Sequence, residues 1–158
     1  MQTALSVVYV CLVAAVGLSA SPDKQYDSNR NSQHIIDAVN TTLVHVKNIW
    51  KVLTMSLNIR LSPPPIMGLT QITHDLGLLA VELQSPVTEL LSQITVDVSG
   101  LEAKVRSRAL RTGCLVDARP TGNTCNDLFP DTVFLLILAK VQRYLEELLL
   151  HKDKLSVC

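Results

Sequence analysis

Apolar residues recur at intervals of three and four positions in four separate segments of this 158-residue chain. That period matches the turn of an α-helix and places the apolar side chains of each segment on one face. The segments cover about 33–57, 69–83, 88–111 and 131–155. In the first segment the stripe consists of Ile36, Val39, Leu43, Val46, Trp50, Leu53 and Leu57. The sequence therefore predicts an all-α fold of four amphipathic helices.

Proline and glycine mark the ends of the predicted helices. The stretch RLSPPPIMG follows the first helix and Pro86 follows the second, and proline cannot continue a helix. Gly113 suits the position just after the third helix, where a chain often turns left-handed. The stretch from Cys114 to Pro130 has the composition of a loop. Expected capping residues are Asn31 or Ser32 for the first helix and Asp127 or Asp131 for the fourth.

The lengths of the connections favour one topology. The few residues around Pro86 allow only an antiparallel pair between the second and third helices. The connections over about 58–68 and 112–130 reach about 36 Å and 63 Å, at about 3.3 Å per extended residue. A helix of about 22 residues is about 33 Å long, so both connections can run the length of a bundle. We predict an up-up-down-down four-helix bundle, the arrangement of the long-chain helical cytokines.

An uncharged apolar run from Ala4 to Ala20 precedes a sharply polar stretch. The run is short for a membrane span, which needs about 20 residues, and small residues close it. We expect a signal peptide over residues 1–20 and a mature domain over residues 21–158, with no membrane insertion after the signal is removed. A retained anchor is the alternative. Secretion exposes cysteines to an oxidising environment, where they can pair.

Three cysteines remain once Cys11 leaves with the signal peptide: Cys114, Cys125 and Cys158. An odd number allows one disulfide and one leftover thiol. Three pairings are possible, and sequence statistics do not choose among them.

Charge and motifs give no support for catalysis. The 14 basic residues balance the 14 acidic ones, so no net field argues for nucleic acid. The four histidines are scattered, and the sequence has no GxSxG, P-loop or GxGxxG motif. We therefore expect no catalytic residue, no metal, no cofactor and no nucleic-acid partner.

Four basic residues gather near the end of the third predicted helix: Lys104, Arg106, Arg108 and Arg111. Cations there complement the helix dipole on a solvated face, and this interpretation is favoured. Contact with a receptor or another acidic partner is the alternative.

Asn40 begins an Asn-Thr-Thr triplet, which is an acceptor sequence for N-glycosylation in a secreted protein. The triplet lies within a predicted helix. Asn40 is therefore a candidate glycosylation site whose local structure works against modification.

The stretch QITVDVSGLEAKVRSRALRTGC, from Gln93 to Cys114, is followed by a loop, the helix AKVQRYLEELL and a terminal LSVC. Together these features resemble the leptin family, particularly the leptins of fishes. Leptins open this helix with QI-S/T-x-D, close it with a cysteine and end on a cysteine. The matching residues here are Gln93, Ile94, Thr95, Asp97, Cys114 and Cys158. The resemblance covers most of the mature chain in architecture, and in residues it is specific over the third helix and the end of the fourth.

The resemblance implies a disulfide between Cys114 and Cys158. It would close a loop of about 45 residues, worth about 4 kcal/mol in the chain-entropy account. Cys125 departs from the family pattern and could be a free thiol, an intermolecular partner or a competitor for Cys114.

The resemblance also implies a secreted hormone. Leptins bind a class I cytokine receptor, the leptin receptor, and signal through JAK–STAT to regulate energy balance and feeding. We expect a monomer without cofactor. The alternatives are another four-helix cytokine, or a secreted carrier of lipid or small apolar ligands.

Family contact positions map onto two regions of this sequence. The main receptor contact would involve Gln93, Asp97 and Lys104 on the third helix, with Gly100 and Ala103 on the same face. Gly100, Ala103 and Lys104 differ from the residues familiar in mammalian leptins. Outward residues of the first helix would complete this contact: Asn40, Thr41, His45 and Lys47. A second contact would lie at the start of the fourth helix, at Asp131 and Thr132.

Overall fold

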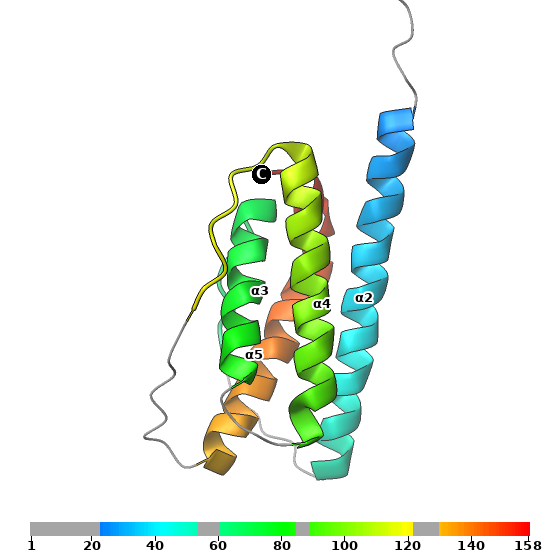
Figure 1. Cartoon of the computed structure of the whole chain (residues 1–158). Coiled ribbons are helices and arrows are strands. Elements are labelled where there is room, and N and C mark those ends of the chain that lie inside the picture. Colours follow the sequence, from blue (N-terminus) through cyan, green and yellow to red (C-terminus); the bar gives the residue numbers. More distant parts are fainter. Residues whose placement is uncertain (1–22, 54–60, 85–88, 122–129) are drawn as a thin grey trace, which may run out of the picture. The chain divides into compact units, whose positions relative to one another are not determined.

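The computed structural model describes residues 23–53, 61–84, 89–121 and 130–158. The chain divides into one unit that ends at Arg30 and a second from Asn31 to Cys158. The described ranges contain no strand, which confirms the all-α class. Their helices are α2 (Asp23–Leu53), α3 (Leu69–Leu83), α4 (Glu89–Thr112), α5 (Pro130–Leu150) and the short 3₁₀ helix η1 (Lys152–Ser156) (Figure 1).

Three helix ends differ from the sequence prediction. Helix α2 begins at Asp23, about ten residues before the expected start, so Asn31 and Ser32 do not cap it. Residues 23–30 are polar, and apolar periodicity therefore gives no signal there. Helix α5 begins at Pro130, a favoured first residue, so Asp131 lies inside the helix. The α-helix ends at Leu150 and its continuation tightens into η1. Leu57 and Asp127 lie outside the described residues.

In the second unit the helices run up-up-down-down, as predicted (Figure 1). The backbone N–H of Leu69, at the start of α3, donates to the carbonyl of Val157, beyond the end of α5, at 2.7 Å. A disulfide between Cys114 and Cys158 joins the ends of α4 and η1, with a Cα–Cα distance of 5.3 Å. Helices α4 and α5 therefore end together where α3 begins, and the pairing that the leptin resemblance implies is present.

One apolar core unites the helices of the second unit. Leu, Ile and Val supply most of it, and the predicted stripes supply its central residues. Ile35 is buried, with 2% of its surface exposed, whereas the predicted Ile36 only packs against the core from its edge. The central buried residues are Val39, Leu43 and Val46 of α2, Ile72, Leu76 and Leu79 of α3, Ile94, Val98, Leu101 and Val105 of α4, and Leu138, Val141, Leu145 and Leu148 of α5.

A buried polar pair joins α3 to α5. The Tyr144 hydroxyl donates to one carboxylate oxygen of Asp75 at 3.2 Å, and the Gln71 amide donates to the other at 2.8 Å. Burial raises the pKa of Asp75, while these two hydrogen bonds lower it. Burial, followed by the neighbouring Asp75, raises the pKa of Tyr144. The pair is satisfied internally, so it serves the packing of the two helices.

Helix α4 ends in a Schellman motif that directs Cys114 toward its disulfide partner. Gly113 has a φ of 83°, the left-handed conformation that its predicted position requires. The N–H of Gly113 donates to the Leu110 carbonyl at 3.1 Å, and that of Cys114 donates to the Ala109 carbonyl at 2.9 Å. The local sequence thus sets the direction in which the chain leaves α4.

The C-terminus is held tightly between α3 and α4. A Cβ added to Gly68 would lie 2.5 Å from the carbonyl carbon of Cys158, so only glycine allows this approach. The Arg108 guanidinium donates through Nε to the Leu155 carbonyl at 2.6 Å and is 5% exposed. Burial, followed by the charge of Arg111, lowers the pKa of Arg108. The prediction that the basic run lies on a solvated face is therefore wrong for Arg108, because the C-terminal segment covers it.

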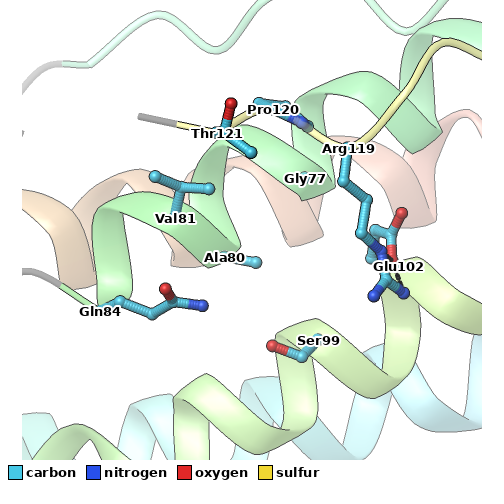
Figure 2. Close-up of a pocket in the computed structure, with 9 residues that line it drawn as sticks. All are labelled: Gly77, Ala80, Val81, Gln84, Ser99, Glu102, Arg119, Pro120 and Thr121. Atoms are coloured by element: carbon cyan, nitrogen blue, oxygen red, sulfur yellow. Dashed lines mark hydrogen bonds and ion pairs between the residues drawn. The ribbon is translucent and has the colours of Figure 1, made fainter. Parts of the chain in front are cut away.

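The connection after α4 is tied to the bundle by an ion-pair cluster. Glu102, 2% exposed, accepts from Arg106 Nε at 2.5 Å. It also accepts from Arg119 Nη2 at 2.7 Å (Figure 2). Pro120 packs against Gly77, where an added Cβ would lie 2.9 Å from Pro120 Cδ. We call the segment 114–121, with its contacts to Glu102 and Gly77, the linker clasp.

Candidate functional site

Three polar side chains meet between α2 and α4. The Gln93 amide donates to Oδ1 of Asp97 at 2.7 Å, and His45 Nδ1 lies 2.5 Å from Oδ2 of the same carboxylate. Two of these residues follow each other one turn apart on α4, and His45 comes from the middle of α2. The structure thus brings together Gln93, Asp97 and His45, which the leptin resemblance assigned to one contact without implying a bond between them.

The bridge between His45 and Asp97 lies at the surface. The side chain of His45 is 35% exposed and that of Asp97 is 14% exposed. A pair so accessible to water contributes little to the free energy of folding, about 0–1 kcal/mol. Its structural effect is to hold Asp97, and through it Gln93, in one orientation on the outer face of α4.

A groove runs beside this bridge along the two helices. It consists of two adjoining hollows of about 390 Å³ and 470 Å³, which share His34 and Lys104. We call it the α2–α4 groove. Residues of α2 that line it are Asn31, His34, Ile35, Asp37, Ala38, Thr41 and Thr42, and those of α4 are Val96, Asp97, Gly100, Leu101, Ala103, Lys104, Ser107 and Arg111.

Small residues of α4 keep this groove open. Gly100 and Ala103 are exposed, and an added Cβ at Gly100 would meet no atom within 4 Å. These are the positions at which the sequence departs from the mammalian leptin pattern, so the departures leave space on the face. Lys104 is exposed beside them.

Sequence reasoning missed several residues of the groove, among them His34, Val96 and Ser107. A partial signal was available, because Gly100, Ala103 and Ser107 recur with helical spacing on the side of α4 away from its apolar stripe. Tertiary packing decides which face of α2 lies opposite these small residues, so the sequence alone does not show the groove.

A cavity of about 650 Å³ lies on another side of the bundle, between α3, α4 and the linker clasp (Figure 2). Its lining includes the Glu102–Arg119 ion pair together with Gln84, Ser99 and Thr121. Sites for apolar ligands are lined mainly by apolar and aromatic side chains. Because charged and polar side chains form much of its lining, this cavity does not suit the apolar ligand of a lipid carrier.

Comparison with known proteins decides the family. No family model matches the chain. The chain is 38% identical to Leptin-B of Oryzias latipes over 158 residues, which cover 100% of both proteins. The chain belongs to the leptin family. Leptins are hormones and the family is not one of enzymes, so the coarse function is that of a leptin hormone.

The second contact region expected from the leptin resemblance lies at the start of α5. Thr132 is exposed there, and Asp131 lies within the first turn of the helix. Thr132 is not among the residues that line the α2–α4 groove, so it lies on a different part of the surface.

The candidate glycosylation residue, Asn40, is exposed on α2. The third residue of its triplet, Thr42, is 2% exposed and donates through Oγ1 to the Ala38 carbonyl at 2.9 Å. An acceptor triplet must reach the transferase in an extended form, so modification would have to precede formation of this helix. Glycosylation at Asn40 stays a prediction for this family member.

Within residues 23–53, 61–84, 89–121 and 130–158, no cluster of three or more His, Cys, Asp and Glu residues could hold a metal ion. In the same part of the chain, no helix has the length and apolar character needed to cross a membrane. Both observations concern the leptin-family domain as the structure describes it.

Proposed function

We propose that the protein is a secreted hormone that binds and activates a leptin receptor, a class I cytokine receptor. Signalling would pass through JAK–STAT and regulate energy balance and feeding. The observation that carries this proposal is the 38% identity to Leptin-B over the full length of both chains. The hormone would act by bringing receptor chains together, and this needs specific surfaces in place of a catalytic site.

The main receptor contact in this proposal is the α2–α4 groove with its bridge. Gln93, Asp97 and Lys104 would contact the receptor from α4, and His45 would hold Asp97 in place. Preorganised polar groups on a rigid helix pair lose little conformational entropy when a partner binds. The hydrogen bond between Gln93 and Asp97, at 2.7 Å, supports this role.

The second proposed contact is the start of α5, at Asp131 and Thr132. The exposed Thr132 supports it. Two separate surfaces on one hormone would allow it to engage two receptor domains at the same time.

Secretion is also part of the proposal. Residues 1–20 would act as a signal peptide, and the mature domain would be a monomer. The Cys114–Cys158 disulfide supports secretion, since such bonds persist mainly in oxidising compartments.

The secretion step can be tested by expressing the full chain in animal cells. We expect the protein in the medium, with an N-terminus near residue 21 by Edman sequencing and a monomeric mass by light scattering. Retention in the membrane fraction with an intact N-terminus would favour the anchor and contradict the signal peptide.

Receptor activation can be tested with the secreted product on reporter cells that carry the leptin receptor of the same species. We expect a saturable STAT response, and none in parental cells without the receptor. Silence from a helical, monomeric protein would contradict leptin-receptor activation and favour another cytokine receptor. Saturable uptake of a fluorescent fatty acid by such a silent protein would favour the carrier.

The contact assignment can be tested with Asp97→Ala. We expect about a tenfold weaker receptor affinity, the effect of losing one well-placed interface residue. Asp153→Ala is the matched control, because Asp153 is exposed on η1 and lies outside the groove. Equal affinities for the two variants would contradict the assignment of this face.

A further inference from the structure

We propose that the α2–α4 groove receives an acidic side chain of the receptor at the end formed by Lys104 and Arg111. This inference rests on the proposed receptor binding and adds the chemistry of the partner. Of the two interpretations of the basic run, it favours contact with an acidic partner for Lys104 and Arg111.

The hollow at this end of the groove is basic. Lys104 and Arg111 line it together with His34, and its lining contains no acidic residue. The two cations lie seven residues apart on α4, a separation of nearly two turns, so they share one face. Their positive potential adds up over the same hollow.

No carboxylate in the described part of the chain forms an ion pair with Lys104 or Arg111. The one hydrogen bond that the structure gives Arg111 runs from Nε to the Ser107 carbonyl of its own helix, at 3.3 Å. The charges of both residues are therefore available to a partner.

The other two cations of the same run are committed to the fold. Arg106 binds Glu102 at 2.5 Å, and Arg108 binds the Leu155 carbonyl at 2.6 Å. All four cations lie near the C-terminal end of α4, where each interacts favourably with the helix dipole, so this effect does not distinguish them. The distinction comes from the groove, because only Lys104 and Arg111 of the run line it.

The far half of the groove contains two carboxylates, and both accept hydrogen bonds from side chains of the same protein. Asp97 is bound by His45 and Gln93, and the Gln33 amide donates to Asp37 at 2.9 Å. The groove thus has carboxylates in its far half and cations at its basic end. An incoming acidic side chain is attracted to that end and repelled from the other, which orients the partner.

The shape of the hollow suits a carboxylate on a short apolar stem. Ala103 and Ser107 leave room beside the cations, and the buried Ile35 supplies an apolar floor. Contact with this floor would remove water from around the ion pair and strengthen it. A glutamate or aspartate of the receptor meets these requirements.

The test measures the affinity of the secreted full-length product for the receptor ectodomain by surface plasmon resonance. We expect Lys104→Glu and Arg111→Glu each to weaken binding by about tenfold, mainly through slower association. Raising the NaCl concentration from about 50 mM to about 300 mM should weaken receptor binding by the unmodified protein. The same change should weaken binding by either variant less. Lys152→Glu is the control, since it makes the same charge change at an exposed residue outside the groove.

A second variant tests the groove without changing charge. Gly100→Leu places a side chain in open space, so the helix should stay folded, and circular dichroism checks this. We expect it to fill the groove and weaken binding by about tenfold. If the unmodified protein binds the receptor, and Lys104→Glu and Arg111→Glu bind it as tightly as Lys152→Glu does, this inference alone is overturned. No binding by the unmodified protein would overturn the proposed function and this inference with it.

Discussion

The end of the bundle where α4 and α5 finish differs sharply from the α2–α4 groove. At the closed end, a disulfide, the buried Arg108 and the linker clasp join segments far apart in sequence. At the groove, the His45–Asp97 bridge links the outer faces of α2 and α4, and small residues leave space beside it. The comparison teaches that this protein uses buried, paired polar groups to hold its fold and exposed, unpaired ones where a partner would bind.

The largest expected effect comes from opening the closed end by Cys114→Ser with Cys158→Ser. The free energy of unfolding should fall by about 4 kcal/mol, because the unfolded chain is no longer restrained by the cross-link. Guanidinium unfolding followed by circular dichroism measures it. Receptor affinity of the folded double variant should stay within about twofold, since the groove is elsewhere. A loss below about 1 kcal/mol would show that the remaining contacts close this end without the disulfide.

Removing the carboxylate of the linker clasp should have the next largest effect. Glu102→Gln leaves Arg106 and Arg119 without their buried partner and should lower the unfolding free energy by about 3 kcal/mol. Asp117→Asn makes the same chemical change at an exposed residue of the same connection and should cost less than about 0.5 kcal/mol. Limited proteolysis should detect release of the segment in the first variant only. Equal unfolding free energies of the two variants would show that the Glu102 ion pairs do not stabilise the fold.

A glycine-to-alanine substitution made once in each region tests the contrast between the closed end and the groove. Gly68→Ala should destabilise by about 2 kcal/mol, because its Cβ would collide with the Cys158 backbone. Gly100→Ala should stabilise by about 0.5–1 kcal/mol, since alanine favours the helix and meets no atom there. Thermal unfolding of both variants measures the difference. The same sign for both would contradict the contrast between a closed end and an open groove.

The smallest effect on stability is expected at the bridge. His45→Ala should lower the unfolding free energy by about 0.5 kcal/mol, because the His45 side chain is 35% exposed to water. Its effect on receptor affinity should be larger, since Asp97 and Gln93 lose their fixed orientation. Asn48→Ala, at an exposed residue of α2 outside the groove, is the control for both measurements. A large loss of stability with unchanged receptor affinity would reverse the roles assigned to the two regions.

Much of the fold was predictable because its signals are local. Apolar spacing located the four helices, and Gly113 marked the end of α4 through its left-handed backbone. The start of α2 was missed because residues 23–30 are polar, and a helix without an apolar face leaves no periodic trace. The candidate contact residues Gln93 and Asp97 came from resemblance to the leptin family, whereas their bridge to His45 came from the structure.

The amino-acid order alone indicates most of the helices and their breaks, because these depend on neighbours within a few turns. The roles of the four cations near the end of α4 depend on packing. Arg108 is buried because the C-terminal segment crosses it, and Arg106 is paired because Glu102 lies one turn before it on a covered face. Lys104 and Arg111 form no ion pair with a described residue, and α2 contributes no carboxylate to the hollow that both of them line. Long-range contacts therefore divide one basic run into residues that hold the fold and residues that face a groove.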